Sequence, residues 1–342
     1  MKRYTSPQRS CQSGRLGRKA RPSMSLFGRY NRFVPPSSLA MRLFLGVDGG
    51  QSSTKAVIGD ETRRILGSGI GGPCNHAAAG EGRARLERGV RASLEAACQN
   101  AGLDAAAVCF EAACFGMSGG PEDKQAILAS ILRTRRLIVT TDAVIALAGA
   151  TSLGQGIAVI AGTGSIAFGR NAEGRVARAG GWGYAFGDEG GGFDTVRQAL
   201  RAALRMEEGW GPPTSLRAAL IGATGSRDSN DMLHRFYGDE WPRARVAALA
   251  PLVDAAALEG DAVALEILSR AAQELALLAA AVRSQLWKPA EAVEVAYIGG
   301  VFQSRTLLER FRLLVELEEG DRCGPPLRSP AEGALLEAYR AG

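Results

Sequence analysis

The sequence predicts an α/β protein of two lobes, each built on the element order βββαβαβα, with a cleft between the lobes. Two observations support this fold class. A Gly-rich turn between two apolar runs occurs at 43–58 and again at 157–168, and a similar series of strand and helix patterns follows each turn. The length of 342 residues, with 44 glycines, leaves room for two domains with many strand–loop–helix junctions.

The first copy of this order ends near residue 151. Its predicted elements are strands over 42–47, 54–58 and 64–69, a helix over 82–100, a strand over 106–116, a helix over 121–132, a strand over 137–140 and a helix over 144–151. The helix over 82–100 is indicated by Leu86, Val90 and Leu94, which recur on one face, and Gly102 ends it.

The second copy carries additional helices. Its predicted elements are strands over 157–161, 166–170 and 175–179, a helix over 193–206, an Ala-rich helical stretch over 243–286, a strand over 293–298 and helices over 304–317 and 330–341. We therefore divide the chain into a leader (1–40), a first lobe (41–150) and a second lobe (151–329).

The leader dominates the formal charge of +6. Nine of the 41 basic residues lie in 1–40, which hold no Asp or Glu, so the other 302 residues carry 32 basic and 35 acidic side chains. The folded part is therefore not basic, and nucleic acid is not an expected partner. The leader itself has three open interpretations: a transit peptide, a disordered tail, or a segment upstream of a translation start at Met41.

The rest of the composition limits the chemistry. No apolar run is long enough to span a membrane, and six scattered cysteines suit reduced thiols in a cytoplasmic protein. Only two histidines, His76 and His234, are present, which disfavours a His-rich metal site or a Ser-His-Asp triad. Any proton transfer is therefore expected to fall to a carboxylate.

Each Gly-rich turn suits a phosphate chain, because backbone N–H groups and hydroxyls converge there. In the first turn, Asp48 ends a buried strand and is the expected Mg²⁺ ligand. The predicted ATP-binding residues there are Gly49, Gly50, Gln51, Ser52, Ser53, Thr54 and Lys55. In the second turn they are Gly162, Gly164 and Ser165. A plain hairpin is the alternative for either turn alone, but a second turn in the corresponding place favours one nucleotide held between two lobes.

Asp142 follows a strand of the first lobe in the sequence Thr140-Thr141-Asp142-Ala143. Ligands of open α/β sheets collect at the carboxyl ends of strands. Asp142 is therefore the candidate catalytic base, which takes a proton from a substrate hydroxyl as that oxygen attacks the γ-phosphoryl group. A helix N-cap is the alternative role.

Three further loops carry candidate binding residues. The segment 180–192 has seven glycines in thirteen positions, and Trp182, Tyr184 and Asp188 offer the flat faces and acceptors that bind sugars. Asn75 in the loop 71–76 is a candidate for a hydroxyl or N-acetyl group. Gly299 and Gly300 leave space for adenine or ribose near the backbone. The respective alternatives are a domain linker, a simple turn and close helix–strand packing.

With these loops in order, the chain resembles the N-acetylglucosamine kinase family, which belongs with the BadF/BadG/BcrA/BcrD-type ATPases in the actin, sugar-kinase and heat-shock chaperone superfamily. The matching segments are VDGGQSSTK, GPCNHA, FGMSGG, TTDA, IAGTGS, GGWGYAFGDEG and YIGGVF. The resemblance implies a two-lobed actin-like, ribonuclease H-like ATPase fold. It also implies that the C-terminal helix (330–342) completes the first lobe and that the protein is a homodimer.

The resemblance implies the following function: ATP-dependent phosphorylation of a small-molecule amino sugar, N-acetyl-D-glucosamine to its 6-phosphate, with Mg²⁺ and with Asp142 as base. The implied sugar-binding residues are Asn75, Ser118, Thr163, Trp182, Gly183 and Asp188. Three substrates or roles remain alternatives: glucosamine, because Ala77 stands where mammalian enzymes carry Trp; a muramic-acid-type sugar; and an ATPase activator without a sugar substrate. No cysteine pair suited to the activators' iron–sulfur cluster is evident, and the zinc motif of ROK sugar kinases is absent.

Overall fold

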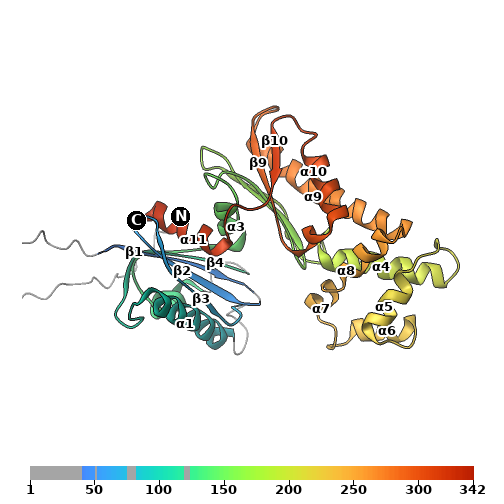
Figure 1. Ribbon diagram of the computed structural model, residues 1–342, viewed down its shortest axis with the longest axis horizontal. Coiled ribbons are helices and arrows are strands. Elements are labelled where there is room, and N and C mark those ends of the chain that lie inside the picture. Colours follow the sequence, from blue (N-terminus) through green and yellow to red (C-terminus); the bar gives the residue numbers. More distant parts are fainter. Residues whose placement is uncertain (1–40, 51, 75–81, 119–123) are drawn as a thin grey trace, which may run out of the picture.

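The computed structural model describes residues 41–50, 52–74, 82–118 and 124–342, and these form two five-stranded sheets (Figure 1). The first sheet holds β1 (Leu43–Gly49), β2 (Thr54–Asp60), β3 (Ile65–Gly71), β4 (Cys109–Met117) and β5 (Arg133–Thr141). The second holds β6 (Gly156–Ala161), β7 (Ser165–Arg170), β8 (Val176–Gly180), β9 (Val293–Ile298) and β10 (Asp321–Gly324). The leader predicted over 1–40 lies outside the described residues.

Helices cover both sheets. They are α1 (Gly82–Ala101), α2 (Gln125–Ile131), α3 (Asp142–Ala150), α4 (Gly192–Glu207), α5 (Leu216–Thr224), α6 (Ser229–Tyr237), α7 (Arg243–Ala247), α8 (Ala250–Leu258), α9 (Ala262–Leu286), the 3₁₀ helix η1 (Gly300–Gln303), α10 (Arg305–Val315) and α11 (Pro330–Ala341). Within the described ranges, no helix has both the length and the apolar character needed to cross a membrane.

The two sheets have the same topology. The strand order is β3-β2-β1-β4-β5 in the first and β8-β7-β6-β9-β10 in the second. In each, three antiparallel strands are followed by two strands parallel to the central one. The predicted duplication is therefore confirmed, and in each lobe three parallel strands present their carboxyl ends at one edge.

The first sheet is apolar on both faces because its residues alternate between two layers. Leu45 and Val47 of β1 belong to the core on the α1 side, whereas Phe44 belongs to a second core with α11. Figure 1 shows α1 on one face of this sheet and α11 on the other, with α3 beside α11. A central strand covered on both faces cannot shift register without exposing one of these layers.

The C-terminal helix α11 packs closely on the first sheet because glycines, which have no side chain, lie at the contact. A Cβ atom on Gly46 of β1 would lie 2.2 Å from the Leu335 backbone nitrogen. A Cβ atom on Gly333 of α11 would lie 2.0 Å from the Ile145 carbonyl oxygen of α3. These approaches admit no side chain, so the last helix of the chain packs directly on β1 and α3.

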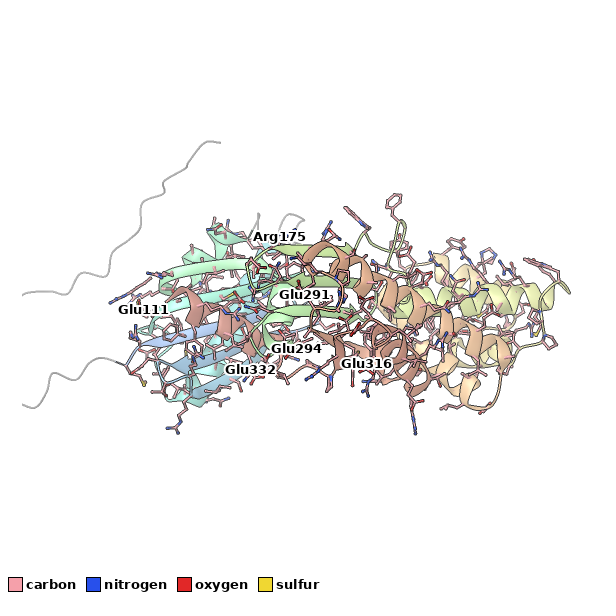
Figure 2. The ribbon with its side chains drawn as sticks, turned by 90° about the horizontal axis from the view of Figure 1, so that it is seen from above. Glu111, Arg175, Glu291, Glu294, Glu316 and Glu332 are labelled. Carbon is pink, nitrogen blue, oxygen red and sulfur yellow. The ribbon has the colours of Figure 1, made fainter. Side chains whose placement is uncertain are left out.

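The two lobes are joined by polar contacts as well as by the chain. Arg170 of β7 forms an ion pair with Glu337 of α11, with 2.7 Å between Nη2 and Oε1. At the start of the second lobe, just after α3, the Ser152 hydroxyl donates to Glu294 of β9 over 2.8 Å, and Figure 2, a view from above, labels Glu294 near the middle of the molecule. Residues near 150 and the end of α11 are thus anchored to the second sheet.

The structure differs from the sequence-based expectation in several places: α5 and α6 were not predicted, and β5 begins four residues before the strand predicted over 137–140. The Ala-rich stretch over 243–286 forms three helices, α7, α8 and α9, with Pro251 in the first turn of α8 and Asp261 as the N-cap of α9. Strand β10 was not predicted, because its sequence Asp-Arg-Cys-Gly has neither the length nor the apolar alternation of a typical strand. As an edge strand, β10 needs a partner on one side only.

Candidate functional site

The first lobe gathers two carboxylates and a hydroxyl at the carboxyl ends of its parallel strands. Asp48 lies near the end of β1 and pairs with Gly116 of β4, while Met117 of β4 pairs with Thr141 of β5. Asp142 therefore begins α3 directly beside them. The Ser118 hydroxyl donates to Asp142 Oδ2 over 2.8 Å, and the Ser118 amide donates to the Gly49 carbonyl over 3.2 Å. These bonds hold the Asp142 carboxylate at the edge of the sheet.

Asp48 is electrostatically unusual. Burial raises its pKa from 3.8 to about 6, Lys55 opposes this shift, and the Asp142 carboxylate adds to it. Lys55 lies opposite Asp48 in the pairing of β1 with β2. Two carboxylates at the carboxyl ends of parallel strands form a place where a cation would be stabilised, and Lys55 of the antiparallel strand β2 supplies one positive charge beside them.

The β1–β2 turn lies beside these carboxylates, and its polar groups divide into two sets. Ser52 is exposed and Ser53 is half-buried, so both hydroxyls are accessible to a ligand. Thr54 is fully buried, and its hydroxyl donates to the Gly72 carbonyl over 2.7 Å. A phosphate contact through Thr54 would break that bond, so the structure gives this hydroxyl a role in holding the loop after β3.

The β6–β7 turn repeats this arrangement in the second lobe. The Gly162 amide donates to the Gly164 carbonyl over 3.0 Å, and the first amides of α4, from Gly192 and Phe193, donate to the carbonyls of Gly162 and Thr163. The Ser165 hydroxyl donates to the Glu189 carbonyl over 2.6 Å and is buried. Ser165 thus corresponds to Thr54: each begins the second strand of its lobe and fastens a later loop.

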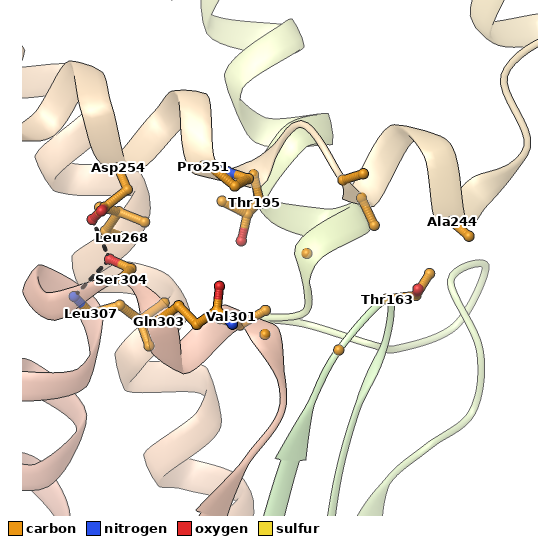
Figure 3. A pocket seen from close by; sticks show the side chains of 16 residues that line it. Thr163, Thr195, Ala244, Pro251, Asp254, Leu268, Val301, Gln303, Ser304 and Leu307 are labelled. Atoms are coloured by element: carbon orange, nitrogen blue, oxygen red, sulfur yellow. Dashed lines mark hydrogen bonds between the residues drawn. The ribbon is translucent and has the colours of Figure 1, made fainter. Parts of the chain in front are cut away.

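A cavity of about 490 Å³ opens beside the β6–β7 turn (Figure 3). All of its lining residues come from the second lobe: Gly162, Thr163, Gly192, Thr195, Ala244, Ala247, Ala248, Ala250, Pro251, Asp254, Leu268, Gly300, Val301, Gln303, Ser304 and Leu307. Small residues dominate one side. Asp254, which accepts a hydrogen bond from Ser304, supplies a carboxylate on the other. This volume and mixture suit a nucleoside, with Asp254 placed to accept from hydroxyl or amino groups.

Gly299 and Gly300 connect β9 with η1 at the edge of this cavity. Gly299 has φ +114, and a Cβ atom there would lie 2.2 Å from the Ala161 carbonyl oxygen, so no other residue fits. Gly300 lines the cavity and has open space where a Cβ atom would stand. Only Gly300 of this pair therefore leaves room for a ligand.

The loop over 181–191 combines exposed aromatic rings with one buried carboxylate. Trp182 is 66% exposed and carries the Arg178 guanidinium over its ring at 4.5 Å, and Gly183 beside it has φ +81. Asp188 is 6% exposed and forms an ion pair of 2.9 Å with Arg243. Exposed rings beside a fixed acceptor are typical of a carbohydrate site.

Two of the predicted site residues, Gln51 and Asn75, lie outside the described residues. The others fall into two groups, at the carboxyl-end edge of the first sheet and around the β6–β7 turn. Within the described part of the chain, no group of three or more His, Cys, Asp and Glu side chains could hold a metal ion. Any cation there would therefore depend on Asp48, Asp142 and the phosphates of a ligand.

Sequence reasoning missed the cavity wall formed by α7 and α8. Ala244, Ala247, Pro251 and Asp254 lie in a stretch that was expected to be helical but was not divided into separate helices. The signal available was Pro251 between two Ala-rich runs, because proline favours a first helical turn and so indicates a break before it.

Comparison with known proteins agrees with this arrangement. The family model described as the BadF/BadG/BcrA/BcrD ATPase family matches residues 45–338, which include both turns and both sheets. The chain belongs to this family. The family assignment and the two-lobed α/β fold expected from the sequence are thereby confirmed.

Individual members of the family carry kinase names. An N-acetylmuramic acid/N-acetylglucosamine kinase of Clostridium acetobutylicum is 34% identical over 284 residues, which are 81% of this chain and 91% of that protein. An N-acetyl-D-glucosamine kinase of Dictyostelium discoideum is 29% identical over 285 residues, 79% of this chain and 88% of that protein. A crystal structure from Chromobacterium violaceum, assigned as an N-acetylglucosamine kinase, superposes with TM-score 0.72 at 29% identity, covering 86% of this chain and 98% of that one.

Proposed function

We propose that the protein is an ATP-dependent amino sugar kinase that converts N-acetyl-D-glucosamine to its 6-phosphate. The observation that carries the proposal is the Asp142–Ser118 pair beside Asp48 at the edge of the first sheet, combined with a nucleoside-sized cavity beside the second turn. The names of the relatives support an amino sugar as the acceptor.

In this proposal Asp142 is the general base. The sugar hydroxyl loses its proton to Asp142 while its oxygen attacks the γ-phosphorus, and ADP leaves with the electrons of the broken bond. Oδ2 of Asp142 accepts from the Ser118 hydroxyl and Oδ1 accepts from the Ala143 amide, so the carboxylate is held in place while each oxygen keeps a lone pair for the acceptor hydroxyl. The charge of the transferring group is largest at the terminal oxygens, so positive charge at the turn lowers the barrier.

Mg²⁺ fits the carboxylate pair. The pKa of Asp48 is raised because burial and the Asp142 carboxylate destabilise its charged form, and a cation would restore that form. Asp48 would hold the ion, and Lys55 opposite it adds charge at the same turn. When bound, Mg²⁺ supplies neutralisation of phosphate charge.

The nucleotide is proposed to lie in the cavity of the second lobe, with its phosphates at the β6–β7 turn. Because the cavity is lined by the second lobe alone, the β1–β2 turn reaches the same phosphates only when the lobes approach each other. Such closure would place the acceptor hydroxyl against the γ-phosphorus and exclude water, which otherwise competes as acceptor.

The deciding experiment measures ADP release from ATP with no sugar and with N-acetylglucosamine, glucosamine and N-acetylmuramic acid in turn. We expect release that depends on N-acetylglucosamine, with phosphorus NMR of the product giving a 6-phosphate. The name of the Clostridium relative makes N-acetylmuramic acid the second candidate substrate. A rate that is independent of every sugar would contradict the kinase assignment and favour an ATPase activator.

The remaining features are proposed on the sequence resemblance. They are a homodimer, a cytoplasmic location, and a first lobe of residues 41–150 completed by the C-terminal helix over 330–342. Light scattering of the purified protein measures its oligomeric state. Mass spectrometry of the native N-terminus shows whether the leader is present.

A further inference from the structure

Arg243, the first residue of α7, contacts two residues of the loop over 181–191. Its Nη2 lies 2.9 Å from Oδ2 of Asp188, and its Cζ lies 4.5 Å from the ring centre of Tyr184. The Tyr184 ring in turn contacts Phe193 edge to face, with 5.5 Å between ring centres. The guanidinium is therefore held by a carboxylate and an aromatic face at once.

Asp188 is 6% exposed, and a buried carboxylate needs a partner of this kind. Its φ of 66 lies in the left-handed region, which few non-glycine residues adopt. The same carboxylate also lies against the β6–β7 turn, since a Cβ atom on Gly164 would stand 2.4 Å from Oδ2. Asp188 is thus fixed between the turn and Arg243, and among the described residues only Arg243 forms an ion pair with it.

The same arginine is connected to the nucleotide cavity through its own helix. Ala244 and Ala247, which follow Arg243 in α7, line the cavity. Ala247 also contacts the start of α4, because a Cβ atom on Gly192 would lie 3.3 Å from the Ala247 carbonyl oxygen. The helix that lines one wall of the cavity therefore also carries the guanidinium that holds Asp188.

We propose that Arg243 is the positioning residue of the sugar site: it holds the Asp188 carboxylate for the sugar and makes sugar affinity depend on nucleotide occupancy. The inference rests on the proposed function. Its physical basis is that α7 both lines the nucleotide cavity and carries Arg243, so a ligand that contacts α7 in the cavity acts on the helix that holds Asp188. By reciprocity, bound sugar strengthens nucleotide binding by the same factor.

The test measures binding of N-acetylglucosamine by calorimetry, with and without a non-hydrolysable ATP analogue. For the wild type we expect the analogue to tighten sugar binding about fivefold or more. Arg243→Met should weaken sugar binding about tenfold through loss of a charge-assisted hydrogen bond. It should also reduce the effect of the analogue to less than about twofold, while analogue binding without sugar stays unchanged.

Two further variants separate positioning from folding. Arg243→Lys keeps the charge but loses the planar fork, so sugar affinity should be intermediate. Arg245→Met is the matched control, because Arg245 lies on the same helix but stacks on Trp241 at 4.1 Å, away from Asp188. In steady state Arg243→Met should raise the sugar KM more than it lowers kcat, and in an Asp188→Asn background it should have no additional effect.

Three results would overturn the inference: wild-type sugar affinity in Arg243→Met, equal weakening of sugar and of analogue alone, or additive effects of the Asp188 and Arg243 variants. Sugar-dependent ADP release by the wild type tests the proposed function separately. An inactive wild type refutes that function, whereas an active wild type with an indifferent Arg243→Met refutes only the role of Arg243.

Discussion

Single residues at the edge of the first sheet carry the proposed chemistry. Asp142 and Asp48 share one electrostatic environment, in which the pKa of Asp48 rises because of burial and because of Asp142. The same closeness that makes two carboxylates costly in the free protein makes them suited to a bound cation and a transferring phosphoryl group.

Replacing Asp142 by Asn should lower kcat by about 10²- to 10⁴-fold, because the amide cannot accept the hydroxyl proton. Binding of ATP and of sugar should change by less than about threefold, since the amide has nearly the same shape. Coupled ADP-release kinetics and calorimetry give both quantities. Ser118→Ala serves as the comparison and should lower kcat less. Wild-type turnover by Asp142→Asn would remove Asp142 from the role of base.

Asp48 predicts an unusual dependence of stability on pH. Because its folded pKa of about 6 is above the usual 3.8, the folded protein binds this proton more tightly than the unfolded chain. The charged Asp48 carboxylate therefore destabilises the folded state. This destabilisation is complete above pH 6 and disappears as pH falls toward 3.8. Asp48→Asn should raise the unfolding free energy of the metal-free protein by about 3 kcal/mol at most at pH 7.5, and by about half of that at pH 5. Urea unfolding at both values measures this; equal gains at both would contradict it.

At this site the sequence did not predict the direction in which each side chain points. Asp48 lies near the end of the buried strand β1 and Asp142 follows β5, and their position was predicted because strand ends are visible as apolar runs. Thr54 and Ser165 directly follow the β1–β2 and β6–β7 turns. Their hydroxyls are nevertheless buried, and they donate to the carbonyls of Gly72 and Glu189. Whether a hydroxyl faces a ligand or a neighbouring loop depends on contacts distant in sequence.

Among the helices, α9 shows how one cap organises a larger region. Asp261 Oδ1 accepts from the backbone amides of Val263 and Ala264, while Oδ2 accepts from Thr214 and Ser215, just before α5. One carboxylate therefore begins the longest helix of the described chain and anchors the segment that leads into α5.

Asp261→Ala should lower the unfolding free energy at pH 7 by about 2 kcal/mol, because it removes a cap and leaves part-buried donors without their acceptor. Although burial alone would raise the pKa of Asp261, its hydrogen bonds lower it below 3.8 overall. Its stabilisation is therefore present above pH 3.8 and is lost as pH falls through the folded value. Thermal unfolding at pH 7 and pH 3 measures this. Asp228→Ala, which removes the smaller cap of α6, should cost about 1 kcal/mol.

At the scale of the whole molecule, the C-terminal helix contacts both sheets. Helix α11 packs on β1, β4 and α3, and its Glu337 binds Arg170 of the second sheet. The last residues of the chain thus complete the core of the first sheet and contact the second. The position of the two turns relative to each other depends on this junction.

Gly333→Ala should destabilise the protein by about 3 kcal/mol, because a Cβ atom would stand 2.0 Å from the Ile145 carbonyl and neither backbone can yield alone. Sugar-dependent activity should fall with the folded fraction. Gly222→Ala in α5 is the control, since it has open space at that position and should be neutral or slightly stabilising. Chemical unfolding curves compare the two, and equal stability of both variants would show that α11 is not tightly docked.

The local pattern of the chain was sufficient to predict the duplicated order of elements, the two turns and the strand-end carboxylates. Apolar periodicity and glycine turns report on backbone conformation within a few residues, and these features depend on little else. The assembly of α7 and α8 into a cavity wall and the Asp188–Arg243 pair could not be obtained that way. Each depends on groups 55 or more residues apart, or on the exact close approach of backbones, and such contacts exist only once the chain has packed.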